Sequence, residues 1–107
     1  MLNRPDEPAC CECCARPIKP LTMHHLIPRS QHKRKSIRKL FDRAERLTQI
    51  MWVCRPCHNM IHLSHSELEL ARYFNTIEKL LADPFMQKYI FWIKDKPADF
   101  MPRTRRT

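Results

Sequence analysis

Apolar and polar positions predict two short strands and a helix in the first two thirds of the chain. Residues 21–27 predict a short strand that stops at Pro28. Residues 48–53 are rich in β-branched and large apolar side chains and predict a second strand. Residues 54–57 predict a turn. A helix should then start near Pro56 or Cys57 and run through His62, since proline suits the first helical turn.

Apolar residues at helical spacing predict three more helices. One lies in residues 29–47 and carries Ile37, Leu40, Phe41, Ala44 and Leu47. The next follows a cap at Ser64 or Ser66 and carries Leu70, Ala71, Phe74, Ile77 and Leu81. The last follows a cap at Asp83 with proline next, and carries Phe85, Met86, Tyr89, Ile90 and Ile93. The apolar stripes of the last two helices are most simply explained as core.

Length and composition indicate one globular domain with a modest core. The chain has 107 residues, of which 43% are apolar, and a metal crosslink would help a domain of this size. It has no glycine, so turns that need a positive φ should be avoided or filled by Asn or Asp. Twenty Lys and Arg against eleven Asp and Glu give a formal charge of +9, which favours a polyanionic partner such as nucleic acid.

Six cysteines could form a disulfide framework or bind metal. The N-terminus lacks the apolar run of a signal peptide, and no stretch is as long as a transmembrane helix, so we expect a cytoplasmic protein with metal-binding thiols. Cys54 and Cys57 form one Cys-x-x-Cys pair, and the other is Cys10 with Cys13 or Cys11 with Cys14. A single pair could be a redox dithiol, but two pairs with clustered histidines favour a closed, structural zinc site.

Four of the six histidines are placed as reactive groups would be. His58 and His62 are four residues apart and share one helix face, which is the spacing that holds one metal. His24 and His25 are adjacent on a strand and point to opposite faces, so one can bind metal while the other takes up a proton. We interpret His32 and His65 as ordinary core or surface residues.

Residues 24–29 (HHLIPR) and 54–62 (CRPCHNMIH) together resemble the zinc-containing branch of the HNH endonucleases, which have a ββα-metal fold. The match spans about residues 11–62, and residues 73–81 are similar to the helical extension of small bacterial HNH proteins of the YisB-like kind. The resemblance implies an α+β protein: a small ββα-metal core with a four-cysteine zinc and C-terminal helices. We accordingly divide the chain into a flexible lead-in (1–9), a nuclease core (10–65), a helical extension (66–96) and a basic tail (97–107).

The resemblance implies a role for each motif residue. His25 matches the general base, and the metal ligands match His24, His62 and, in some members, His58. The first zinc pair best matches Cys11 and Cys14, which leaves Cys10 and Cys13 as extra. The family's middle Asn, which steadies the loop bearing the base, is replaced here by Gln49, with the same donor and acceptor on a longer stem.

These residues predict metal-dependent hydrolysis of phosphodiester bonds in DNA. His25 would take the proton of the attacking water, and a divalent ion would stabilise the charge on the phosphate. Imidazole ligands favour zinc, nickel or manganese over magnesium, and all four are candidates. The resemblance implies a 5′-phosphate product.

The alternative is a zinc-stapled nucleic-acid-binding module without activity, which Gln49 favours and the three motif histidines oppose. A third interpretation, a zinc-stapled protein-interaction domain, leaves the histidines and the charge unexplained.

Binding is expected to come from the basic segment 29–46, which holds eight Lys or Arg and two acidic residues, and from the C-terminal arginines. The expected contacts are Arg29, Lys33, Arg34, Lys35, Arg38 and Lys39. A solvated helix face would also be this basic, but the segment adjoins the motif. Phosphate contacts carry affinity without reading bases, so specificity is expected to be low or to come from a protein partner.

Overall fold

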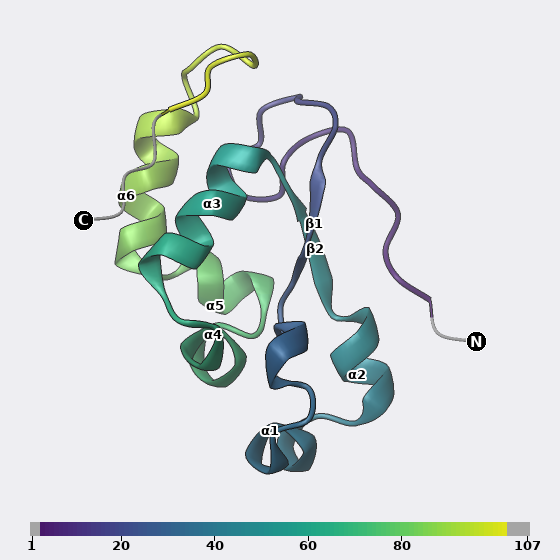
Figure 1. The fold of residues 1–107 in the computed structure, drawn as a ribbon. Coiled ribbons are helices and arrows are strands. Elements are labelled where there is room, and N and C mark those ends of the chain that lie inside the picture. The colour runs from purple at the N-terminus through teal and green to yellow at the C-terminus, as the bar shows by residue number, and fades with distance from the viewer. Residues whose placement is uncertain (1–2, 103–107) are drawn as a thin grey trace.

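A two-stranded antiparallel sheet lies at the centre of the computed structural model, which describes residues 3–102 (Figure 1). Strand β1 is Thr22–His25 and strand β2 is Ile50–Val53. Thr22 pairs with Val53 and His25 with Ile50. Both predicted strands are present and shorter than predicted, and the α+β class is confirmed.

The remaining elements are helical. Between the strands lie the 3-10 turn η1 (Arg29–Gln31), α1 (Lys35–Leu40) and α2 (Arg43–Thr48). After β2 come α3 (Arg55–Ser64), α4 (Glu67–Tyr73), α5 (Ile77–Leu81) and α6 (Pro84–Ile93). Helix α3 starts directly after β2 with Pro56 in its first turn, as predicted, and lies between the sheet and α6 (Figure 1). The ββα unit is therefore β1, β2 and α3.

The single helix predicted within residues 29–47 is wrong: the segment forms two helices, α1 and α2. The break is a capping box, in which Glu45 N donates to Asp42 Oδ1 (2.8 Å) and Asp42 N donates to Glu45 Oε1 (3.1 Å). The predicted apolar stripe is also not buried along its length: within α1, Ile37 is fully buried, whereas Leu40 is 61% exposed.

The helix predicted after Ser66 is also two helices. Ser66 is the cap of α4, and it forms a capping box with Glu69. The helical structure is interrupted at Asn75, whose buried side-chain amide donates to Ala71 O (2.8 Å). Thr76 then caps α5 by accepting from Lys79 N (3.1 Å). Two local polar side chains thus end a helix that apolar spacing alone would continue.

Helix α6 has Asp83 at its N-cap position and proline in its first turn, as predicted, but the Asp83 side chain makes no capping hydrogen bond. The Asp83 carboxylate instead accepts a hydrogen bond from His65 Nε2 (2.6 Å), and the His65 ring stacks on Phe74 at 4.1 Å. Phe85, predicted as core, is 68% exposed, whereas Met86 and Ile93 are fully buried.

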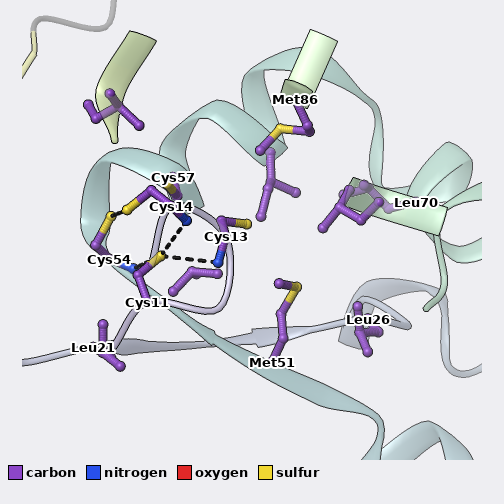
Figure 2. Close-up of a cluster of buried hydrophobic side chains, with 14 residues drawn as sticks. Cys11, Cys13, Cys14, Leu21, Leu26, Met51, Cys54, Cys57, Leu70 and Met86 are labelled. Carbon is purple, nitrogen blue, oxygen red and sulfur yellow. Dashed lines mark hydrogen bonds between the residues drawn. The ribbon is translucent and has the colours of Figure 1, made fainter. Parts of the chain in front are cut away.

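The main core includes the cysteines, which lie together at one side of it, and the C-terminal helices complete it (Figure 2). Its largest members come from the sheet, α3, α4, α5 and α6: Met51, Val53, Ile61, Leu70, Leu80, Met86 and Ile93. A smaller cluster of Ile27, Ile37 and Ala71 joins α1 to α4. Strand β2 and the thiols therefore share one core with the helices that follow α3.

The segment before β1 runs along the sheet without regular structure over residues 3–8. Arg4 Nε donates to Leu47 O (3.0 Å) and Trp52 Nε1 donates to Pro5 O (2.9 Å). Ala15 takes a φ of 64°, so the expectation that Asn or Asp would fill such positions is wrong; a Cβ there costs about 1–2 kcal/mol. No helix of the described part could cross a membrane. Of the basic tail, residues 103–107 lie outside the described residues.

Candidate metal centres and active site

Four cysteine sulfurs converge between the loop before β1 and the start of α3 (Figure 2). Cys11 and Cys14 come from the loop; Cys54 directly follows β2 and Cys57 lies in the first turn of α3. All four are buried, and their Sγ atoms lie within 4.8 Å of one another. Cys14 Sγ and Cys54 Sγ are 3.8 Å apart. A tetrahedral site with Zn–S bonds of about 2.3 Å has a sulfur–sulfur spacing of about 3.8 Å, so the set fits zinc.

Hydrogen bonds from backbone amides distinguish the two candidate cysteine pairs. Cys11 Sγ accepts hydrogen bonds from Cys13 N (3.3 Å), Cys14 N (3.5 Å) and Cys54 N (3.3 Å). Cys13 thus contributes its amide, while its side chain is part of the core, and Cys10 is half-buried outside the cluster. The structure groups Cys11 and Cys14 with the second pair.

The four thiols differ in acidity: the pKa values of Cys11 and Cys14 are lowered, whereas those of Cys54 and Cys57 are raised. The pKa of Cys11 is lowered, because hydrogen bonds from Cys13 and Cys14 stabilise its thiolate. The pKa values of Cys54 and Cys57 are raised, first of all because their hydrogen bonds to Cys11 keep them protonated. A bound Zn²⁺ would allow all four ligands to be thiolates.

Arg16 is a buried cation beside these sulfurs. Its side chain is 4% exposed, with Nε donating to Cys14 Sγ (3.3 Å) and Nη2 to Cys54 Sγ (3.6 Å). Its Nη1 donates to Pro97 O (2.9 Å), beyond the end of α6. The guanidinium can therefore offset thiolate charge and also tie the C-terminal segment to the cysteines.

Three histidines form a second cluster, the histidine trio: His24, His58 and His62. Strand β1 directs His24 into the core, where it is fully buried, and one turn of α3 separates His58 from His62. One ring nitrogen from each lies within 4.8 Å of the others, and the ring centroids are 5.1–5.4 Å apart.

The trio has the properties of a metal site. Within residues 3–102, neither ring nitrogen of His24 has a hydrogen-bond partner, although both are buried. Burial, followed by the charges of His58 and His62, lowers the pKa of His24 to about 3. Burial, followed by the charge of His62, lowers the pKa of His58 to about 4. The imidazoles are thus neutral near pH 7, the form that binds a divalent ion, so these residues fit such an ion.

Thr22 determines which nitrogen of His58 is available. Thr22 Oγ1 donates its one proton to Val53 O (2.9 Å) and lies 2.8 Å from His58 Nδ1. Since the hydroxyl proton is already used, the hydrogen-bond network assigns the proton to His58 Nδ1, which donates to Thr22. The lone pair of His58 is then on Nε2, and Thr22 holds the ring.

His25 lies in a hollow of about 240 Å³ beside the trio, the His25 hollow, together with His58 and His62. Its Nε2 is buried, without a partner among residues 3–102. The pKa of His25 is lowered, first by burial and then by Arg4, His32 and Arg29. A neutral imidazole here is able to accept a proton. An adjoining hollow of about 810 Å³ shares His58 and His62 and opens over α3.

Glu67 is a site residue that sequence reasoning missed. It lines both hollows from the first turn of α4 and accepts a hydrogen bond from Ser30 Oγ. It comes from the helical extension, and no motif or spacing in the sequence connects it with the histidines.

The other predicted site residues are distributed unevenly. The backbone carbonyl of Gln49 accepts from Leu26 N (3.0 Å), one residue after His25, but Gln49 lines a separate hollow and not the His25 hollow. Arg29 lines the His25 hollow. Lys33 and Arg38 line another hollow between α1 and α2, and Arg34 donates to Gln31 Oε1. Lys35 and Lys39 are exposed on α1 and line none of these hollows.

A ββα unit with a thiol cluster at one end and a histidine cluster on its helix is the arrangement of the ββα-metal class of proteins. The HNH endonuclease family model matches residues 11–64, and the chain belongs to this family. The chain is similar to the uncharacterized protein YisB of Bacillus subtilis (strain 168), with 28% identity over 97 residues that cover 91% of this chain and 85% of that protein. No solved structure matches the chain significantly.

Proposed function

We propose that the protein is a metal-dependent endonuclease that hydrolyses phosphodiester bonds in DNA. The observation that carries this is a buried His24 without a hydrogen-bond partner in the described part of the chain, grouped with His58 and His62 beside a neutral His25. A structural role does not require a buried imidazole without partners, since such polar groups destabilise a fold. Membership of the HNH family supports the same reaction class.

Each residue has one task in this proposal. The trio holds a divalent ion, which when bound supplies positive charge at the scissile phosphate and the leaving oxygen. His25 accepts a proton from the attacking water, and its lowered pKa keeps it unprotonated at neutral pH. Arg29 lines the same hollow and can contact the phosphate. Gln49 acts through its backbone, by holding the residue after His25.

The cysteine cluster has no part in the reaction. Cys11, Cys14, Cys54 and Cys57 make a closed four-sulfur site with no open position, and we propose that it holds structural zinc. The three imidazoles suit Mn²⁺, Ni²⁺ or Zn²⁺ more than Mg²⁺, which prefers oxygen ligands. We also propose that the chain is divided into a lead-in, a nuclease core at 10–65, a helical extension at 66–96 and a basic tail. We further propose a protein partner as the source of sequence specificity.

The second candidate is a nucleic-acid-binding module without activity. It is favoured by Gln49, which stands where the resemblance expects Asn and whose side chain lies outside the His25 hollow.

Plasmid nicking separates the two candidates. Zinc-loaded protein is incubated with supercoiled plasmid and Mg²⁺, Mn²⁺, Ni²⁺ or added Zn²⁺, as wild type, His25→Ala and the control Lys88→Ala, which removes an exposed side chain of α6 that lines neither the His25 hollow nor the hollow next to it. We expect wild type to nick with at least one ion and His25→Ala to be slower by roughly 10²–10⁴-fold. The control should keep most of the maximal rate, and thermal melts check that each variant is folded.

Two outcomes decide the proposal. No nicking with any ion would reject the enzyme and leave the binding module, provided that the protein still shifts the plasmid. Equal nicking by wild type and His25→Ala would reject His25 as the base.

A further inference from the structure

A hollow lined almost entirely by basic side chains lies among η1, α1 and α2. This basic hollow has a volume of about 500 Å³ and is lined by His32, Lys33, Arg38, Arg43, Arg46 and Leu47. It shares no residue with the His25 hollow. The two adjoin, since the ring centroids of His25 and His32 are 6.5 Å apart.

The cations of the basic hollow have no acidic partners among residues 3–102. The two acids of this segment, Asp42 and Glu45, are bonded to each other's backbone amides in the capping box. Across the described chain, the ion pairs are Lys19 with Glu7 and His65 with Asp83, and neither involves the hollow. Four permanently charged side chains around one concavity repel one another, and an anion would relieve that repulsion.

One of the cations is already held in place. Arg46 is half-buried, and it donates from Nη1 to His32 O (2.8 Å) and from Nε to Asp42 O (3.3 Å). A guanidinium fixed in this way loses less conformational freedom when it binds a phosphate than a free side chain would.

We propose that the basic hollow binds the phosphodiester backbone of the substrate strand, next to the phosphate that the His25 site cleaves. The inference rests on the proposed nuclease function for the identity of the strand. It assigns Arg43 and Arg46, which the sequence did not single out, and leaves Lys35 and Lys39 outside the contact. Because the contact is the same before and during the reaction, it sets affinity and KM and leaves kcat unchanged.

The test compares two double variants that each remove two positive charges. Arg38→Gln with Arg43→Gln removes half of the permanent charges of the basic hollow without touching the Arg46 hydrogen bonds, and Lys88→Gln with Lys94→Gln removes two exposed charges at α6. Binding of a labelled DNA duplex to zinc-loaded protein is followed by fluorescence anisotropy, with no divalent ion added, from about 50 to 200 mM KCl. Zinc content and melting temperature confirm that both variants are folded.

We expect the hollow variant to bind roughly tenfold more weakly or worse, and its plot of log affinity against log salt to be shallower by about 1 for each phosphate that is no longer bound. The α6 variant should follow wild type. Equal weakening in the two variants would mean diffuse charge attraction and would overturn the proposal, as would unchanged affinity in both.

Cleavage assays and a phosphate competition complete the test. In the plasmid assay the hollow variant should raise KM and keep kcat within about twofold; a lower kcat at unchanged KM would overturn the proposal. If wild type binds DNA but cleaves none, the nuclease function fails while the binding arm still decides the role of the hollow. Inorganic phosphate at constant ionic strength should not displace the duplex, and displacement from wild type but not from the hollow variant would assign the hollow to free phosphate instead.

Discussion

Replacing Thr22 by valine should weaken divalent-ion binding at the histidine trio without unfolding the protein. Valine has nearly the shape of threonine and suits a strand, but it offers no acceptor to His58 Nδ1–H. The imidazole then loses the contact that fixes its tautomer and its orientation, and Nε2 is no longer held as the ligand atom.

The size of the effect follows from the hydrogen bond that is removed. Loss of a partner that orients a metal-bound histidine costs about 10–100-fold in metal affinity, which is about 1.4–2.7 kcal/mol. The hydrogen bond from Thr22 to Val53 O is lost as well, with a stability effect of about 0.5–1.5 kcal/mol that valine's apolar surface partly offsets. Thr22→Ser keeps the hydroxyl and should bind metal about as well as wild type.

Calorimetric titration of Ni²⁺ or Mn²⁺ into zinc-loaded protein measures the affinity, with zinc content followed to show that the cysteine cluster is unchanged. His58→Ala is included as the variant that removes the ligand itself. The reasoning is refuted if Thr22→Val binds as tightly as wild type while His58→Ala does not. If wild type binds no ion, the metal site itself is refuted.

Two further predictions concern the cysteines and pH. Cys54→Ala should unfold the domain, because it removes a zinc ligand within the core. Cys10→Ala should leave zinc content and melting temperature unchanged. If zinc assays and thermal melts showed equal effects of the two substitutions, the assignment of Cys11 and Cys14 as ligands would be contradicted. Ion affinity at the trio should be constant above the ordinary histidine pKa of about 6.5 and fall only at lower pH, with the steepest loss through about 4 and about 3, because the pKa values of all three imidazoles are lowered and those of His58 and His24 lie at about 4 and about 3. Titrations in matched buffers would oppose this if affinity already declined as the pH fell from about 7.5 to about 6.5.

The motif residues could be predicted because each motif depends on residue types only a few positions apart in the sequence. Two residues between cysteines make a chelating turn, and a separation of four positions places His58 and His62 on one helix face. The helix predictions failed where the apolar spacing continues across polar residues that cap a new helix. Asp42 with Glu45 starts a new helix inside one stripe, and Thr76 starts another, because these caps satisfy backbone amides that a continuous helix would use itself.

Some contacts could not be found from the sequence because their partners are far apart along the chain. Glu67 reaches the His25 hollow only because α4 packs against η1. Thr22 acts on His58 because β1 and α3 are neighbours in space, and Arg16 reaches Pro97 across most of the chain. None of these pairs has a spacing that periodicity could detect.

By itself, the sequence determined the family, the ligand types and the ββα order, since these depend on residue chemistry over a few positions. It left open which of two overlapping pairs joins the cysteine cluster. The tertiary structure groups Cys11 and Cys14 with Cys54 and Cys57, because these four sulfurs all lie within 4.8 Å of one another. It also decided that the basic segment folds around a hollow rather than along one helix face, because the cap at Asp42 turns α2 away from α1.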